Sequence, residues 1–280
     1  MATAAGVTFY AILAIFPAVA ALVSLYGLFA DAGKIAAHLD QLSGFLPGGA
    51  VDVLRDQMTR VASKPPSTLG LTFFASLLIA LWSANAGMKA LFDALNVVYE
   101  EEEKRSFLRL NIVSLTFTAG GILFFLAATT AVVVLPLVVD FAGFGGTTKT
   151  LIEIARWPAL LVVITLALAC IYRYGPSREK PRWRWITWGS ASAAIGWLLA
   201  SFLFSWYAAN FGSYNETYGS LGAVVGFMIW IWISTTVILV GADLDAEMEH
   251  QTARDTTVGR PKPMGARGAV MADTVGSAQG

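Results

Sequence analysis

Residues 222–250 read GAVVGFMIWIWISTTVILVGADLDAEMEH, and this stretch decides the fold. Residues 222–242 contain no charged side chain. The hydrocarbon core of a bilayer is about 30 Å thick, and about 20 apolar residues in an α-helix cross it. A helix also satisfies its own backbone hydrogen bonds in lipid. The stretch therefore predicts a membrane-spanning helix that ends in acidic residues.

The rest of the chain has a similar composition. Of its 280 residues, 56% are hydrophobic and 14% are charged, whereas about 25% of residues in soluble domains are charged. The apolar stretches show no strand-like alternation, which favours helices. We predict an all-α, polytopic membrane protein with about six transmembrane helices. The predicted spans are residues 7–30, 69–88, 110–139, 157–174, 186–211 and 218–243.

Lysine and arginine are distributed unevenly between the predicted connections. If the N-terminus is inside the cell, the inner segments contain Lys89, Lys104, Arg105, Arg109, Arg173, Arg178, Lys180, Arg182, Arg184, Arg254, Arg260, Lys262 and Arg267. The outer segments then contain Lys34, Arg55, Arg60, Lys64, Lys149 and Arg156. Cytoplasmic loops carry an excess of basic residues. We therefore predict a multi-pass protein of the bacterial inner membrane with both termini in the cytoplasm.

Two segments lie outside the predicted spans. Residues 31–68 show helical spacing of apolar side chains on both sides of the break FLPGG at residues 45–49. Short amphipathic helices between the first and second spans fit this pattern, either packed on the bundle or forming a lid over an outward cavity. Beyond residue 250, Thr, Gly, Pro and scattered charge replace the apolar periodicity. We predict a membrane domain over residues 1–250 and a disordered cytoplasmic tail over residues 251–280.

The acids of residues 243–249 require compensation. At the C-terminal end of a helix, the dipole disfavours each negative charge by about 0.3–1 kcal/mol. Asp243 and Glu247 share a helical face at i, i+4 spacing. We expect cytoplasmic ion pairs between these acids and the basic residues Arg173 and Arg178. The alternative is a proton or cation relay, because acids at membrane depth are commonly functional.

Small residues form stripes on the last two predicted spans. The candidates for helix packing are Gly189, Gly196, Gly219, Gly222 and Gly226. Small faces let helix backbones approach closely in lipid, where apolar burial gives little drive to associate. We expect these two spans to pack together, and the alternative is a thin wall beside a substrate path.

Two connections combine polar and aromatic residues. The stretch YRYGPSREKPRWRWITW, residues 172–188, places tryptophan among arginines, which suits an interfacial anchor better than a nucleic-acid site. The stretch ANFGSYNETYGSLG, residues 209–222, leads into the last predicted span. The free amides of that helix N-terminus could receive an anionic headgroup. The alternative is a tight turn with tyrosines at the interface.

Residues for hydrolytic or metal chemistry are sparse, and the usual motifs are missing. His38 and His250 are predicted on opposite sides of the membrane, and the single cysteine, Cys170, lies in an apolar run. One cysteine forms neither an intramolecular disulfide nor a thiol cluster. We predict no catalytic residues, no cofactor and no metal site, and we do not expect an enzyme.

Several stretches together carry a resemblance to a known family. They are AAGVTFYAILAIFP (residues 4–17), SANAGMKALFDALNVVYEEEEKRSF (83–107), YRYGPSREKPRWRWITWG (172–189) and FSWYAANFGSYNETYGSLGAVVGFMIWIWISTTVILVGADLDAE (204–247). Over residues 4–249 the chain resembles the YihY/BrkB family of bacterial inner-membrane proteins, long mislabelled as ribonuclease BN. The resemblance implies a helical membrane protein with both ends in the cytoplasm and a role in the cell envelope. Where the family commonly has GAELN, this chain has GADLD at residues 241–245.

The predicted function is a transporter or flippase-like carrier of an amphiphilic envelope molecule, either a lipid or a lipid-linked compound. Polar groups that are rare in a bilayer mark the candidate path. They are Tyr10, Pro17, Asn85, Asn96, Tyr214, Asn215, Tyr218, Ser220 and Asp243. The alternative is a structural or assembly protein of the envelope whose polar residues only pack helices. The expected partners are membrane lipids and not nucleic acid, and a homo-oligomer is compatible with the sequence.

Overall fold

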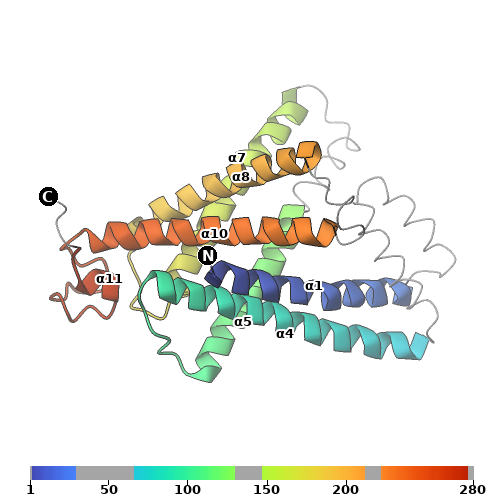
Figure 1. The fold of residues 1–280 in the computed structure, drawn as a ribbon, viewed down its shortest axis with the longest axis horizontal. Helices are drawn as coiled ribbons and strands as arrows, with labels where there is room; N and C mark the ends of the chain where they lie inside the picture. Colours follow the sequence, from blue (N-terminus) through green and yellow to red (C-terminus); the bar gives the residue numbers. More distant parts are fainter. Residues whose placement is uncertain (1, 30–65, 130–146, 212–221, 277–280) are drawn as a thin grey trace. The chain divides into compact units, whose positions relative to one another are not determined.

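The computed structural model describes residues 2–29, 66–129, 147–211 and 222–276. The long helices along the chain are α1 (Ala2–Phe29), α4 (Pro66–Val98), α5 (Phe107–Thr129), α7 (Thr147–Tyr174), α8 (Thr187–Phe211) and α10 (Gly222–His250) (Figure 1). A 3-10 turn, η2 (Trp183–Trp185), precedes α8, and a short helix, α11 (Val270–Asp273), lies near the C-terminus. Over the described ranges, the regular structure is helical apart from one antiparallel bridge between Pro181 and Thr257.

The prediction of an all-α, polytopic membrane protein is confirmed. Among the described residues, 5 helical segments are long and apolar enough to cross a membrane, namely Phe73–Val98, Phe107–Phe124, Thr150–Tyr174, Thr187–Tyr207 and Val224–His250. Ala2–Ala14 is a shorter apolar helix at the start of α1. The amphipathic helices predicted within residues 31–68 fall almost entirely outside the described residues.

The long helices carry large apolar side chains on their outer surfaces. Leu78, Trp82 and Phe202 are 68%, 77% and 69% exposed. Soluble proteins rarely expose contiguous apolar patches of this kind. Hydrocarbon is the environment that fits these surfaces, because lipid tails do not penalise apolar side chains.

Two compact units make up the chain. Unit 1 comprises Met1–Ala90 and Ala200–Thr235, and unit 2 comprises Leu91–Leu199 and Thr236–Gly280. Helices α4, α8 and α10 therefore each contribute residues to both units. In unit 1, Trp230 of α10 donates a hydrogen bond to Ser201 of α8 over 3.3 Å. The core of unit 2 contains the fully buried side chains of Phe92, Leu95 and Tyr172.

Helix α4 continues past the predicted end of its span at Met88 because residues 88–98 contain neither proline nor glycine. It ends where Glu100 adopts a left-handed conformation with φ of 54°. The N–H of Glu101 then donates to the carbonyl of Asn96 over 2.8 Å. This is a Schellman ending, which satisfies the last carbonyls of a helix. It turns the chain sharply into the connection to α5.

Helices α8 and α10 approach closely within unit 2. A Cβ atom added to Gly241 would lie 2.5 Å from Cβ of Ala193 and 2.7 Å from the carbonyl oxygen of Gly189. A Cβ atom on Gly196 would lie 3.2 Å from Val237. The structure thus places two predicted packing glycines, Gly189 and Gly196, against α10. Gly226 has no atom within 4 Å of an added Cβ, and Gly219 lies outside the described residues.

Residues 251–276 fold against the rest of unit 2, which differs from the predicted disordered tail. Thr256 and Thr257 are buried, and the N–H of Arg182 donates to the carbonyl of Thr256 over 2.9 Å. Arg267 is also buried and donates to backbone carbonyls of the tail, including that of Ala272 over 2.6 Å. The segment is ordered mainly by polar contacts, whereas a composition-based prediction of disorder rests on low apolar content.

Candidate functional site

Several helix ends meet in unit 2 and form one polar region. It contains the connection 99–106 between α4 and α5, the connection 175–186 between α7 and α8, the acidic end of α10 and residues 251–273. We call this region the loop–tail cluster. Because the ends of α4, α7 and α10 meet the starts of α5 and α8 here, successive helices run in alternating directions. That alternation is expected of a multi-pass membrane bundle.

The two connections are tied together by a side chain of α4, Asn96, and by a side chain of the connection 99–106, Arg105. The carbonyl oxygen of the Asn96 side chain accepts the N–H of Ser177 over 2.7 Å. Arg105 donates to the carbonyls of Gly175 and Tyr174 over 2.8 and 3.3 Å. Arg105 therefore satisfies carbonyls at the end of α7, which lack helical partners, and Asn96 satisfies a backbone N–H of the connection that follows.

Arg105 also pairs with Glu103, at 2.6 Å between Nη2 and Oε2. Partial burial by itself raises the pKa of Glu103, but hydrogen bonds from the side chain and backbone N–H of Arg105 lower it to about 2. Glu103 is therefore ionised at neutral pH and holds the guanidinium group over the end of α7.

A buried ion pair joins the second connection to α10. Nη2 of Arg178 lies 2.5 Å from Oε2 of Glu249, and both side chains are almost completely buried. The Thr256 hydroxyl donates to the other carboxylate oxygen of Glu249. The Arg178 guanidinium also lies 4.7 Å from the centre of the Tyr99 ring. The ion pair thus joins the connection 175–186 to the end of α10, and the bond from Thr256 adds the tail to the same carboxylate.

The predicted partners of this arginine were wrong. Arg178 pairs with Glu249, and Asp243 and Glu247 are exposed. At about 100° per residue, positions 243 and 245 point about 200° apart on a helix. Gly241, Asp245 and Glu249 lie on the face that packs inward. Both pairs of acids have i, i+4 spacing, and the close contact of Gly241 with α8 selects the face of Asp245 and Glu249. In the sequence, the small residue at position 241, four residues before Asp245, is the one mark of that face.

Asp245 is the buried acid that lies closest to the α8–α10 contact. It is 1% exposed, and its Oδ1 accepts the N–H of Gly189 over 2.7 Å. An added Cβ on Gly189 would lie 2.5 Å from the other oxygen, Oδ2. Only a glycine at position 189 leaves room for this carboxylate beside the start of α8.

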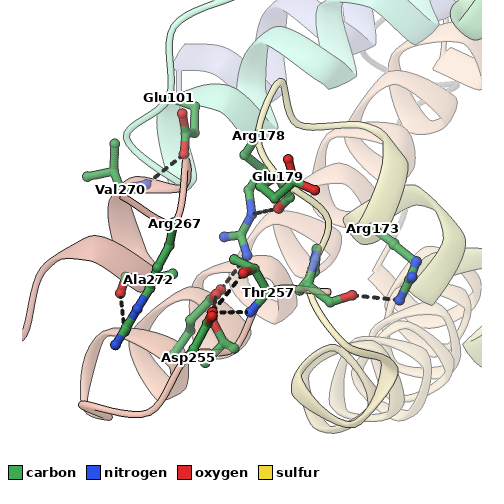
Figure 2. A network of polar contacts seen from close by, with 12 residues as sticks. Glu101, Arg173, Arg178, Glu179, Asp255, Thr257, Arg267, Val270 and Ala272 are labelled. Carbon is green, nitrogen blue, oxygen red and sulfur yellow. Dashed lines mark hydrogen bonds and ion pairs between the residues drawn. The ribbon is translucent and has the colours of Figure 1, made fainter. Parts of the chain in front are cut away.

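Arg173 contacts groups other than the acids predicted as its ion-pair partners. It is 8% exposed, donates to the carbonyl of Pro181 over 2.6 Å, and lies 4.5 Å from the centre of the Trp183 ring. Figure 2 shows Arg173 and Arg178 near the same connection, with Asp255, Thr257 and Arg267 on the tail. Arg173 therefore stabilises the turn that leads into α8.

The predicted path residues are distributed over both units and over segments outside the described residues. Asn85 is buried in unit 1, and Asn96 is buried in unit 2. Tyr10 is 38% exposed in α1, and Pro17 lies within the same helix. Tyr214, Asn215, Tyr218 and Ser220 lie outside the described residues. Among the residues that are described, no group of at least 3 His, Cys, Asp or Glu side chains is placed to hold a metal ion.

Apolar helices that gather charged connections and a folded tail at one end define an integral, multi-pass membrane protein. Residues 1–265 match the protein family described as Virulence factor BrkB. The chain belongs to this family, in agreement with the resemblance seen in the sequence.

Relatives from bacteria carry related descriptions. The ribonuclease-like protein YfkH of Bacillus subtilis is 31% identical over 226 residues, which cover 73% of this chain and 80% of that protein. A UPF0761 membrane protein of Mannheimia succiniciproducens is 26% identical over 87% of this chain and 82% of its own length. One from Neisseria meningitidis is 35% identical, but over only 34% of this chain and 23% of its own length. No solved structure matches the chain.

Proposed function

We propose that this membrane protein is a transporter or flippase-like carrier of an amphiphilic envelope molecule, either a lipid or a lipid-linked compound. The observation that carries the proposal is a set of buried polar atoms that have no hydrogen-bond partner among the described residues. They are Oδ1 of Asn85, the hydroxyl of Tyr99, Nε of Arg173, Nη1 of Arg178 and Oδ2 of Asp245.

Such atoms are costly to keep. Leaving a buried polar group unsatisfied costs about 1–3 kcal/mol, and native proteins contain few of them. Asn85, Arg173 and Asp245 lie within the segments that are apolar enough to span a membrane. Polar and ionisable residues at such positions commonly mark substrate or ion paths.

A structural or assembly protein is the second candidate. For that role, apolar side chains of similar size would stabilise the bundle at least as well as buried charges do. The retained polar atoms therefore favour the carrier over a protein whose helices only pack.

We propose further that the loop–tail cluster faces the cytoplasm of a bacterial inner membrane. Its connections and tail carry many basic residues, among them Lys104, Arg178, Arg182 and Arg267. Positive charge accumulates in cytoplasmic loops. With α1 as a further span, the N-terminus lies on the same side as the tail.

The carrier is tested by reconstituting the purified protein in vesicles that contain a trace of fluorescent phosphatidylglycerol or phosphatidylcholine. A membrane-impermeant reductant bleaches the label in the outer leaflet, so the slow second phase of bleaching reports movement from the inner leaflet. We expect a faster second phase than in protein-free vesicles. Equal rates with and without protein, for each headgroup, would contradict the carrier and favour the assembly role.

The proposal assigns no catalytic chemistry to the chain. The name of the Bacillus subtilis relative refers to ribonucleases, so nuclease activity is the enzyme function to test first. We expect the purified protein to leave labelled RNA intact, with or without added divalent cations. Cleavage that copurifies with the protein and disappears in variants of the loop–tail cluster would overturn this part of the proposal.

A further inference from the structure

Unit 2 contains a strongly basic cavity of about 410 Å³. The basic side chains that line it are Lys104, Arg105, Arg109, Arg173, Arg178 and Lys180. Among the described lining residues, Glu179 is the one carboxylate. Binding sites for small molecules typically measure about 300–1,000 Å³, so the cavity has room for a charged group of headgroup size.

Part of this positive charge is already neutralised by acids outside the cavity. Glu101 pairs with Lys104 at 2.7 Å, Glu103 with Arg105 at 2.6 Å, and Glu249 with Arg178 at 2.5 Å. The remaining cations are Arg109, Arg173 and Lys180. Within the described ranges, none of these three has a carboxylate within ion-pair distance. The cavity therefore keeps a net positive charge even when Glu179 is counted.

The cavity lies where membrane-spanning segments meet polar connections. Arg109 and Val113 belong to the first two turns of Phe107–Phe124, and Arg173 and Tyr174 end Thr150–Tyr174. The opposite wall is formed by the connection 175–186 and by Gly268 of the tail. A site with one wall on apolar helices and one on charged loops lies at the level of lipid headgroups.

We propose that this cavity binds the phosphate of an anionic phospholipid headgroup. Guanidinium groups present several N–H donors in a plane and bind phosphate oxygens in pairs. Nε of Arg173 and Nη1 of Arg178 are buried without acceptors among the described residues. A phosphate group offers acceptors to the arginines around it, and the apolar wall at Val113 suits the start of an acyl chain.

The proposal deepens the proposed carrier function and rests on it for the role of the ligand, because it names the headgroup class that the carrier would recognise. Binding is measured without any lipid movement, so the two ideas fail separately. Bound phosphatidylglycerol without movement would reject the carrier and keep the site. Lipid movement by a protein whose cavity variant binds phosphatidylglycerol as well as the control does would reject the site and keep the carrier.

The test compares the full-length protein with the double variant Arg109→Gln/Lys180→Gln. Arg109 and Lys180 are exposed. Their side chains form no hydrogen bond or ion pair with another described residue, and glutamine leaves the backbone bond from Val258 to the carbonyl of Lys180 in place, so the variant should fold. The matched control is Arg260→Gln/Lys262→Gln, which removes the same charge from exposed positions in the tail. Each protein is purified in a neutral detergent and titrated with phosphatidylglycerol, phosphatidylcholine or inorganic phosphate while its thermal unfolding is followed.

We expect phosphatidylglycerol to raise the melting temperature of the wild type and the control, and phosphatidylcholine to have little effect. In the cavity variant, the concentration needed for half of the shift should rise by about tenfold or more, which corresponds to about 1.4 kcal/mol of lost affinity. Equal responses of the cavity variant and the control would overturn the proposal. Inorganic phosphate that matches phosphatidylglycerol at equal concentration would overturn the assignment to a lipid.

Discussion

At the scale of single residues, Asp245 combines two demands. It is buried in α10, and its carboxylate accepts a hydrogen bond from the backbone N–H of Gly189 in α8. A carboxylate in this position serves both the contact between α8 and α10 and, under the proposed function, the passage of charge. These two roles respond differently to conservative substitution.

Asp245→Ala should lower the free energy of unfolding by about 1–3 kcal/mol, because the N–H of Gly189 loses its acceptor. Asp245→Asn keeps an acceptor oxygen and should unfold near the wild-type temperature. If the charge matters for transport, Asp245→Asn should still slow lipid movement by about tenfold, equivalent to about 1.4 kcal/mol in the barrier. Thermal unfolding and the vesicle assay measure the two effects.

Asp243→Asn is the matched control for Asp245, because Asp243 lies in the same part of α10 and is exposed. We expect it to change neither stability nor lipid movement. Wild-type movement in Asp245→Asn would show that the buried carboxylate serves packing alone.

The ion pair between Arg178 and Glu249 gives a second prediction at this scale. Arg178→Ala leaves a buried carboxylate without its partner, and such a loss costs about 3–5 kcal/mol. We expect a large fall in melting temperature. Arg260→Ala, at an exposed position, should change the free energy of unfolding by about 0.5 kcal/mol or less. A mild effect of Arg178→Ala would mean that solvent reaches Glu249.

At the scale of elements, the contact between α8 and α10 depends on glycine. Gly241→Ala places a methyl group 2.5 Å from Cβ of Ala193, and overpacking of this kind costs about 1–3 kcal/mol. Gly226→Ala in the same helix meets no atom within 4 Å and should be neutral or stabilising, since alanine favours helix by about 1 kcal/mol. Melting temperatures of the two variants test this contrast. Similar values would mean that the helices separate locally without cost.

The tail is an element whose attachment we expect to depend on pH. Burial by itself raises the pKa of Asp255, but the N–H groups of Lys262 and Thr257 and the Thr257 hydroxyl donate to its carboxylate and lower the pKa to about 2. For Asp273 burial also raises the pKa, but the N–H groups of Arg267, Gly268 and Gly265 outweigh it and lower it. Both carboxylates therefore stabilise the folded tail in their ionised form.

Because both pKa values are depressed on folding, this stabilisation is present above the ordinary value of 3.8 and is lost as the pH falls through the lowered pKa values, of which that of Asp255 is about 2. A fluorophore on Arg260→Cys, in a Cys170→Ala background, should report release of the tail in that range. In Asp255→Asn/Asp273→Asn the tail should already be loosened at neutral pH. An acid transition that survives unchanged in the double variant would assign it to other groups.

At the scale of the whole molecule, the arrangement of helix ends determines which segments share one side of the membrane. The connections 99–106 and 175–186 and the tail all contact one another, as in the hydrogen bond from Val270 to Glu101 over 2.8 Å and that from Glu179 to Gly268 over 3.0 Å. They must therefore lie on the same side. The charge distribution in the sequence favours the cytoplasm for that side.

Single cysteines test this topology in a Cys170→Ala background. In intact cells, Arg184→Cys and Arg260→Cys should react with a membrane-impermeant maleimide only after permeabilisation, whereas Lys34→Cys in the predicted outer segment should react at once. Both Arg184 and Arg260 are exposed, so burial does not hide them. Labelling of Arg184→Cys or Arg260→Cys from outside would reverse the proposed orientation.

The sequence by itself determined the class of fold, because hydrophobic length alone requires helices that cross a bilayer. It also indicated that small residues such as Gly189 mediate packing, since their spacing is local. Periodicity could not decide which of two acidic faces on α10 turns inward, because Asp243 with Glu247 and Asp245 with Glu249 have the same spacing.

Only the tertiary structure decided that Asp245 and Glu249 are buried and that residues 251–276 fold onto the connections. The physical reason is that both outcomes rest on hydrogen bonds and ion pairs between segments far apart in the chain. Hydrophobic burial leaves a periodic trace in one segment, whereas a polar contact depends on where its distant partner comes to lie.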